Sequence, residues 1–86
     1  MENLSEVGQV THYYSKIGVA VIQLKAPLNV GDTILIKGAT TNLEQKVESM
    51  EIEHRNVVSA EAGQSVGLKV KGKVRERDIV YRKVSS

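Results

Sequence analysis

Side chains branched at Cβ dominate the core-forming residues of this chain, and that bias constrains its fold more than any other feature. The 86 residues include 13 Val and 6 Ile against 6 Leu, with no Phe and no Trp. Branching at Cβ restricts χ1 and suits the pleated surface of a sheet better than a helix. A chain this short forms one domain and has little core to give up for a deep catalytic pocket. We therefore expect a single all-β domain over residues 1–86, with an ordered core at about 7–84.

Short segments of alternating polarity, separated by turn residues, indicate where the strands lie. The turn at 26–32 is built from Pro27, Asn29, Gly31 and Asp32, which fix φ, tolerate φ > 0 or bond to nearby backbone. Strands at intervals of about ten residues are typical of a barrel or a sandwich. The strands expected from the residues alone are 7–14, 19–24, 33–38, 65–70 and 79–82.

Residues 42–55 fit two different structures. As a strand, the segment would place Met50 and Ile52 on one face and would need a bulge near Glu48. As a helix, it would carry a stripe at spacings of four, three, four and three residues. The side chains of that stripe are Leu43, Val47, Met50, His54 and Val57. The residues alone leave both structures open.

Residue types that carry catalysis or hold metals are scarce. The chain has no Cys, which excludes disulfides, thiolate catalysis and Cys-ligated zinc. The two histidines, His12 and His54, are not spaced as metal ligands. Residues 67–73 match the spacing of a phosphate-binding loop, but Val74 stands where Ser or Thr must hold Mg²⁺. We expect no enzymatic activity, no cofactor and no metal.

Neither a leader peptide nor a membrane span is expected. The first residues, MENLSEV, lack a basic region and an apolar region. The longest apolar run is six residues, at 17–22, whereas a spanning helix needs about 20. The sequence predicts a cytoplasmic protein with no membrane partner.

Lysine and arginine are concentrated in the last fifth of the chain. Residues 1–68 hold five Lys or Arg and eight Asp or Glu, whereas residues 69–86 hold seven and two, giving net charges of −3 and +5. Within residues 67–77 the cations alternate with apolar or small residues, so in a strand they would share one face. Such a row can bind nucleic-acid phosphates. The candidate nucleic-acid-binding residues are Lys69, Lys71, Lys73, Arg75, Arg77, Arg82 and Lys83.

The same row has a second interpretation, a solvated strand face whose lysines keep the sheet edge from aggregating. A turn between Gly72 and Glu76 would break the row in two. The aromatic residues are equally ambiguous, since Tyr13, Tyr14 and Tyr81 could stack on bases or bury their rings at the edge of the core.

Three segments resemble the second domain of elongation factor Tu and its relatives. They are GVAVIQL at 18–24, LNVGDTILIKG at 28–38 and AGQSVGLKVKG at 62–72. SMEIEHR at 49–55 is similar to the stretch that helps to hold the aminoacyl end of tRNA in that factor. The chain departs from the family pattern at Glu53, where an aromatic is usual, at His54, where an arginine is usual, and at Gln64, where an aspartate is usual.

A closer resemblance is to the C-terminal domain of collagenase-like peptidases and to stand-alone proteins called translation elongation factor-like. Segments 10–24, 38–54 and 73–84 carry it, with Arg77 replacing a usual glycine. The resemblance implies a closed antiparallel Greek-key barrel of six or seven strands, in which residues 43–53 are a strand. It implies nothing catalytic, because the peptidase chemistry lies in another domain.

Two functions remain as hypotheses. The first is a binding module for tRNA, rRNA or a ribonucleoprotein that uses the basic row. The alternative is a protein-interaction adaptor that works in trans with a larger GTPase or peptidase-like enzyme. Its candidate surface is the acidic stretch from Glu44 to Glu61. The sequence predicts neither the individual partner nor the oligomeric state.

Overall fold

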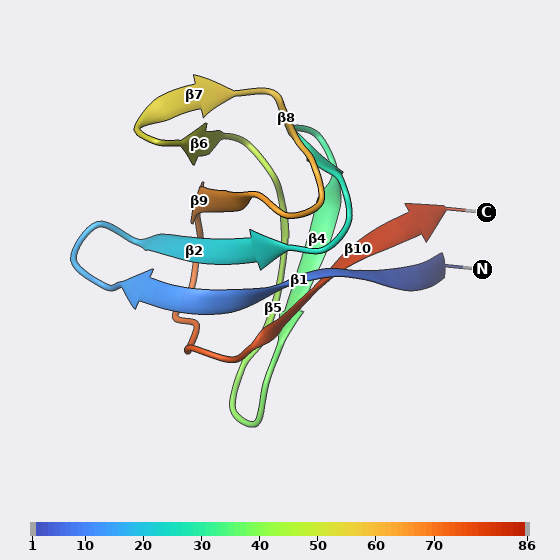
Figure 1. The fold of residues 1–86 in the computed structure, drawn as a ribbon. Helices are drawn as coiled ribbons and strands as arrows, with labels where there is room; N and C mark the ends of the chain where they lie inside the picture. The colour runs from blue at the N-terminus through green and yellow to red at the C-terminus, as the bar shows by residue number, and fades with distance from the viewer. Residues whose placement is uncertain (1, 86) are drawn as a thin grey trace.

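The computed structural model describes residues 2–85, and all regular elements in that range are strands. Eight of them form one antiparallel sheet in the order β5-β4-β10-β1-β2-β9-β6-β7, and β3 and β8 form a small second sheet (Figure 1). The prediction of an all-β chain is confirmed. The strands are β1 Glu2–Tyr14, β2 Val19–Leu24, β3 Leu28–Asn29, β4 Thr33–Lys37, β5 Asn42–Lys46, β6 Met50–Ile52, β7 Arg55–Val57, β8 Ser59–Ala60, β9 Ser65–Lys69 and β10 Ile79–Ser85.

The ambiguous segment 42–55 is made of strands, as the family resemblance implied, and the helical interpretation of its periodicity is wrong. β5 pairs with β4, and β6 pairs with β9. The chain bends at residues 47–49, where the bulge was expected, and the bend changes the inward phase. Val47 and Met50 both point into the core and are 1% exposed. A bent strand thus reproduces the spacing of a helix.

The two ends of the large sheet are linked by this same segment. β5 is the first strand in the order and β6 is next to last, yet only residues 47–49 separate them. The sheet must therefore curl until its ends approach each other, as Figure 1 shows. No ladder among residues 2–85 joins β5 to β7 or β9, so the expected closed barrel of six or seven strands is not found in this hydrogen bonding.

A buried glutamine joins the sheet where no ladder does. Gln45, on β5, is 6% exposed. Its Nε2 donates to the carbonyl of Lys69 at 2.9 Å, and its Oε1 accepts from the amide of Lys71 at 2.7 Å. The side chain therefore replaces one pair of backbone hydrogen bonds between β5 and the end of β9. We call this pair of bonds the Gln45 clasp.

Aliphatic side chains fill the interior, as the composition predicts. In β2 the buried positions are Ala20, Ile22 and Leu24, with Val19 and Val21 half-buried on the outward side. The β1–β10 ladder reaches Asn3 opposite Val84, beyond the ordered core expected from the sequence. The largest fully buried side chains are Ile22, Leu24, Leu28, Ile34, Ile36, Met50 and Leu68.

Three turns have the same pattern of hydrogen bonds. In each, the amide of the first residue donates to the side chain of the fourth, and the amide of the fourth donates to the carbonyl of the first. The third residue has a positive φ, which favours glycine. It is Gly31 (101°), Gly63 (92°) or Arg77 (77°). The first and fourth residues are Asn29 with Asp32 (2.9 and 3.1 Å), Glu61 with Gln64 (2.8 and 3.2 Å), and Arg75 with Asp78 (2.8 and 3.2 Å).

Two departures from the family pattern are explained by these turns. Gln64 supplies the acceptor oxygen that an aspartate would supply, so that turn is kept. Arg77 occupies a left-handed position where the other two turns have glycine. A Cβ in this conformation lies too close to the following carbonyl oxygen, at a cost of about 1–2 kcal/mol. Arg77 is therefore a source of backbone strain.

Replacing Arg77 by Gly should raise the free energy of unfolding by about 1 kcal/mol, because the strain of the left-handed Cβ is removed. Urea denaturation measures the change. Arg77→Ala is the matched control, since it removes the same charge and keeps the Cβ. Equal stabilisation by both variants would show that charge, and not backbone strain, is responsible.

Removing the Gln45 clasp should lower the free energy of unfolding. In Gln45→Leu the carbonyl of Lys69 and the amide of Lys71 lose their partner in a part-buried place, and we expect a loss of about 2–3 kcal/mol. Gln23→Leu is the control, because it also removes a glutamine that bonds to backbone, but at an exposed site. Nε2 of Gln23 donates to the carbonyl of Gly63 at 3.2 Å. That change should cost less than about 1 kcal/mol. Similar losses in the two urea titrations would contradict the role of the clasp.

Candidate interaction groove

The basic residues expected to form one row do not lie along one strand. β9 ends at Lys69, and residues 70–78 form a loop that leads to β10. Val74 anchors this loop in the core at 1% exposure, and the turn that ends at Asp78 redirects the chain. A turn at 75–78, which overlaps the one expected near Gly72 to Glu76, therefore breaks the row.

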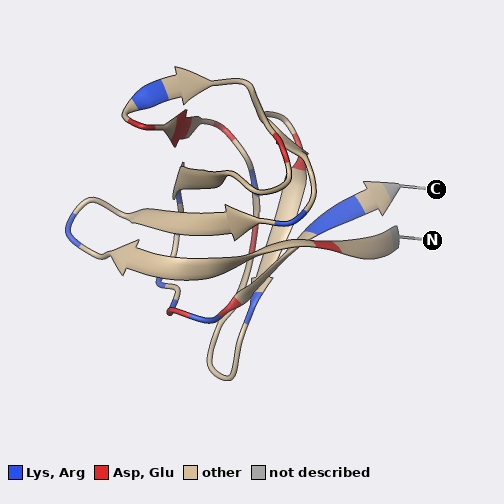
Figure 2. Cartoon of the chain, viewed as in Figure 1, with Lys and Arg blue, Asp and Glu red and all other residues tan. Residues whose placement is uncertain are grey.

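Some of these cations are neutralised within the molecule. Lys71 lies 3.1 Å from Glu48, Arg82 lies 3.9 Å from Asp32, and Lys83 lies 2.9 Å from Glu44. Figure 2 shows acidic and basic segments interspersed along the ribbon. The seven candidate residues are spread over β9, the 70–78 loop and β10. Binding of a partner by this set stays a prediction.

A groove of about 490 Å³ lies on the outward side of the sheet, between the β1–β2 hairpin and the β6–β7 hairpin. Tyr14 and Ile17 line it from the first hairpin, and both are exposed, at 48% and 61%. Glu51, Glu53 and His54 line it from the second. The remaining lining residues are Val19, Val21, Ser65, Val66 and Gly67.

The register of the paired strands determines which residues form the floor of the groove. Directly opposed residues of antiparallel strands point to the same face of the sheet. One outward row therefore crosses β1, β2, β9 and β6, and Val19 lies beside it. Its members are His12, Val21, Gly67 and Glu51, linked by successive register pairs. The floor is thus apolar at its centre, and a glycine in β9 leaves it open.

Gly67 is not required by the fold. Its φ is not in the left-handed range, and a Cβ built on it would lie 3.5 Å from Val19 Cγ1, an ordinary contact. Gly8 in β1 differs, because a Cβ there would lie 2.5 Å from the carbonyl oxygen of Gln23. Glycine within a strand weakens it and often marks a place where a ligand or another backbone approaches closely.

The acidic wall of the groove stands on a tight hairpin. Ile52 pairs with Arg55, so Glu53 and His54 form a two-residue turn, with φ of 51° and 65°. Positive φ at both positions is the signature of a type I′ turn, which prefers Asn-Gly. Within residues 2–85 neither Glu51 nor Glu53 forms an ion pair, whereas Glu44 and Glu48 do.

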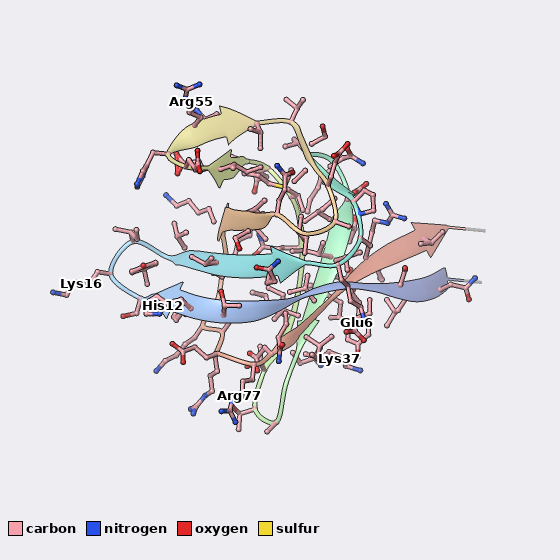
Figure 3. All side chains as sticks on the ribbon, in the orientation of Figure 1. Glu6, His12, Lys16, Lys37, Arg55 and Arg77 are labelled. Atoms are coloured by element: carbon pink, nitrogen blue, oxygen red, sulfur yellow. The ribbon has the colours of Figure 1, made fainter. Side chains whose placement is uncertain are left out.

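Tyr14, the aromatic residue of the groove wall, is contacted by His12 on the same strand. The rings of His12 and Tyr14 are 4.2 Å apart and tilted by 55°. Nδ1 of His12 lies 3.2 Å from Oε2 of Glu76, in the loop before β10. Tyr13 packs partly against the core, as expected of a strand tyrosine, while Tyr14 does not. Figure 3 shows His12 on β1 with its side chain directed toward the loop below.

The described part of the chain has neither a cluster of metal ligands nor a helix that could span a membrane. In residues 2–85 no three His, Asp or Glu side chains are grouped as metal ligands. The same range contains no helix with the length and apolarity needed to cross a membrane.

Comparisons with known proteins point to peptidases. An uncharacterised protease of Methanocaldococcus jannaschii is 48% identical over 77 residues, which are 88% of this chain and 19% of the protease. A collagenase of Porphyromonas gingivalis is 41% identical over 78 residues, 88% of this chain and 22% of the collagenase. The chain thus spans about a fifth of the length of the curated relatives it matches. No family model matches.

The fold has a solved counterpart. It is the C-terminal domain of a Geobacillus thermoleovorans protein assigned to the U32 peptidases, with a TM-score of 0.85 and 25% identity over 94% of this chain and 93% of that one. These similarities support the resemblance to the C-terminal domain of collagenase-like peptidases. The expected kinship with translation elongation factors, and the RNA-binding role drawn from it, are wrong, because these relatives are peptidase proteins.

The claim that Gly67 does not serve the fold can be tested through stability. Gly67→Ala should raise the free energy of unfolding by about 0.5–1 kcal/mol, since alanine has less conformational entropy to lose. Gly8→Ala should lower it by about 1–3 kcal/mol, because the added methyl group overlaps the backbone of β2. Thermal and urea unfolding of both variants gives the comparison. A marked loss in Gly67→Ala would show that the fold itself needs the glycine.

Proposed function

We propose that this chain is a non-catalytic accessory module that contacts the catalytic part of a collagenase-like peptidase. The observation that carries the proposal is the pattern of coverage. Nearly the whole chain, 88%, matches proteases in which it accounts for only 19% or 22% of the length. Most of each relative therefore lies outside the match, and the module has a larger protein to act upon.

The side chains of the module support a role in contact rather than in chemistry. No cysteine is available as a nucleophile. Nδ1 of His12 lies 3.2 Å from Glu76, its ring contacts Tyr14, and His54 lies in a turn. Within residues 2–85, no serine or threonine hydroxyl forms a hydrogen bond with either histidine. A nucleophile and its base must lie within hydrogen-bond reach of each other. The adaptor hypothesis, on its peptidase side, fits these observations.

The adaptor hypothesis names the acidic stretch from Glu44 to Glu61 as its surface, and the structure reduces the number of its carboxylates that are available to a partner. Of the carboxylates between Glu44 and Glu61, two form ion pairs within the molecule, with Lys71 and Lys83. Glu51 and Glu53 line the groove instead. Unpaired charge beside an apolar floor is the surface that a partner can use, because contacts between domains of one protein are commonly mixed in polarity.

A domain exchange tests the proposal. The 78 matched residues of the Porphyromonas gingivalis collagenase are replaced by this chain, and collagen cleavage is compared with that of the parent and of a deletion mutant. We expect the exchange to retain the parent rate to within about threefold. The deletion should lose at least about tenfold, because misplacement of substrate or catalytic groups can cost a hundredfold.

Circular dichroism and gel filtration establish that all three proteins are folded. A folded chimera no more active than the deletion mutant would contradict the proposal. Equal activity of all three proteins would contradict it as well, since the module would then be dispensable.

A further inference from the structure

We propose that the groove binds one segment of the partner peptidase, in which an exposed apolar side chain is flanked by arginine or lysine. The inference rests on the proposed function and deepens it by naming the surface and the chemistry of its occupant. It depends on the size and floor of the groove, on its exposed apolar wall and on the charge of its opposite wall.

The size of the groove suits a peptide segment. Its volume of about 490 Å³ is within the range of about 300–1,000 Å³ typical of binding pockets. The floor is formed by Val19 and Val21, which are half-buried on the outward side of β2, and by Gly67. Because Gly67 has no side chain, an incoming group can approach the backbone of β9 closely.

The apolar wall is exposed to solvent and forms one side of the groove. Ile17 is 61% exposed at the tip of the β1–β2 hairpin, and Tyr14 is 48% exposed beside it. Tyrosine is enriched at protein interfaces, because its ring is rigid and its hydroxyl tolerates a wet rim. The His12 ring contacts the Tyr14 ring in a tilted arrangement, which restrains the wall before a partner arrives.

The charge of the opposite wall selects the occupant. Within residues 2–85, Glu51 and Glu53 line the groove and no lysine or arginine does, while Lys69, which pairs with Val19, lies beside the floor on the same face. Figure 3 shows the labelled cations of the two hairpins, Lys16 and Arg55, projecting away from the body of the molecule. The wall therefore attracts arginine or lysine and repels phosphate, so the geometry favours a basic protein segment over a nucleic acid.

A titration of the isolated chain tests this inference without the peptidase. The ¹⁵N-labelled protein is titrated with the capped pentapeptide Gly-Arg-Leu-Arg-Gly and with Gly-Glu-Leu-Glu-Gly as the matched control. We expect saturable amide shifts confined to the groove, with a Kd of about 1 mM or below for the basic peptide only. Gly67→Val, which fills the floor, should weaken binding at least about tenfold.

Reversal of charge gives a second, independent arm. The double variant Glu51→Lys with Glu53→Lys should lose the basic peptide and bind the acidic one. Lys73→Glu should change neither affinity, because Lys73 does not line the groove. Unchanged thermal unfolding temperatures of these variants keep loss of folding apart from loss of binding.

Several outcomes would overturn the inference. They are equal affinity for the two peptides, shifts centred on residues 71–77, displacement of the peptide by a single-stranded oligonucleotide, and concentration-dependent self-association through the groove. The two proposals fail separately. Peptide binding with an inactive chimera contradicts only the accessory function, and an active chimera whose module binds no peptide contradicts only the assignment of the groove.

Discussion

The arrangement of the molecule depends on the Gln45 clasp. The large sheet begins at β5 and ends at β7, and within residues 2–85 no strand pairs with the outer side of β5. The amide group of Gln45 spans this gap with two hydrogen bonds to the backbone that follows β9, at 2.9 and 2.7 Å. A buried amide with both of its bonding functions used ties the two sides together.

The clasp also determines where the groove can form. Residues 42–52 run along β4 and then bend onto β9, so holding β5 near the end of β9 directs β6 to its place. Glu51 then lies opposite Gly67, and the β6–β7 turn is carried to the side of the sheet that faces Tyr14. The position of the groove is thus a consequence of how this sheet curls.

Most of the fold could be predicted from the sequence, because its long strands carry alternating valine and isoleucine. β2 was predicted with its bounds, and β4 and β9 to within one residue at their ends. β3, β7 and β8 were missed, since segments of two or three residues show no periodicity. The helical spacing of apolar residues in 42–55 suggested the wrong element, because a bend in a strand can produce the same spacing.

The site was harder to predict than the fold. Tyr14, Val21, Glu51 and Gly67 are far apart in the sequence and meet only through the pairing of β1, β2, β9 and β6. The basic row was predicted as a site because its residues are contiguous in the sequence. In the structure the 70–78 loop and an ion pair of Lys71 separate its cations from one another. One usable signal was the glycine in the middle of β9, at a position where no turn is needed.

If the module meets a peptidase through this groove, as we propose, the walls of the groove are covered in the active chimera. Hydroxyl-radical footprinting of side chains, in the isolated chain and in the active chimera, tests it most directly. We expect oxidation of Tyr14 and Ile17, exposed by 48% and 61%, to fall several-fold in the chimera, while Val58, 77% exposed, is oxidised equally in both. Equal oxidation of Tyr14 and Ile17 in the two proteins would contradict it.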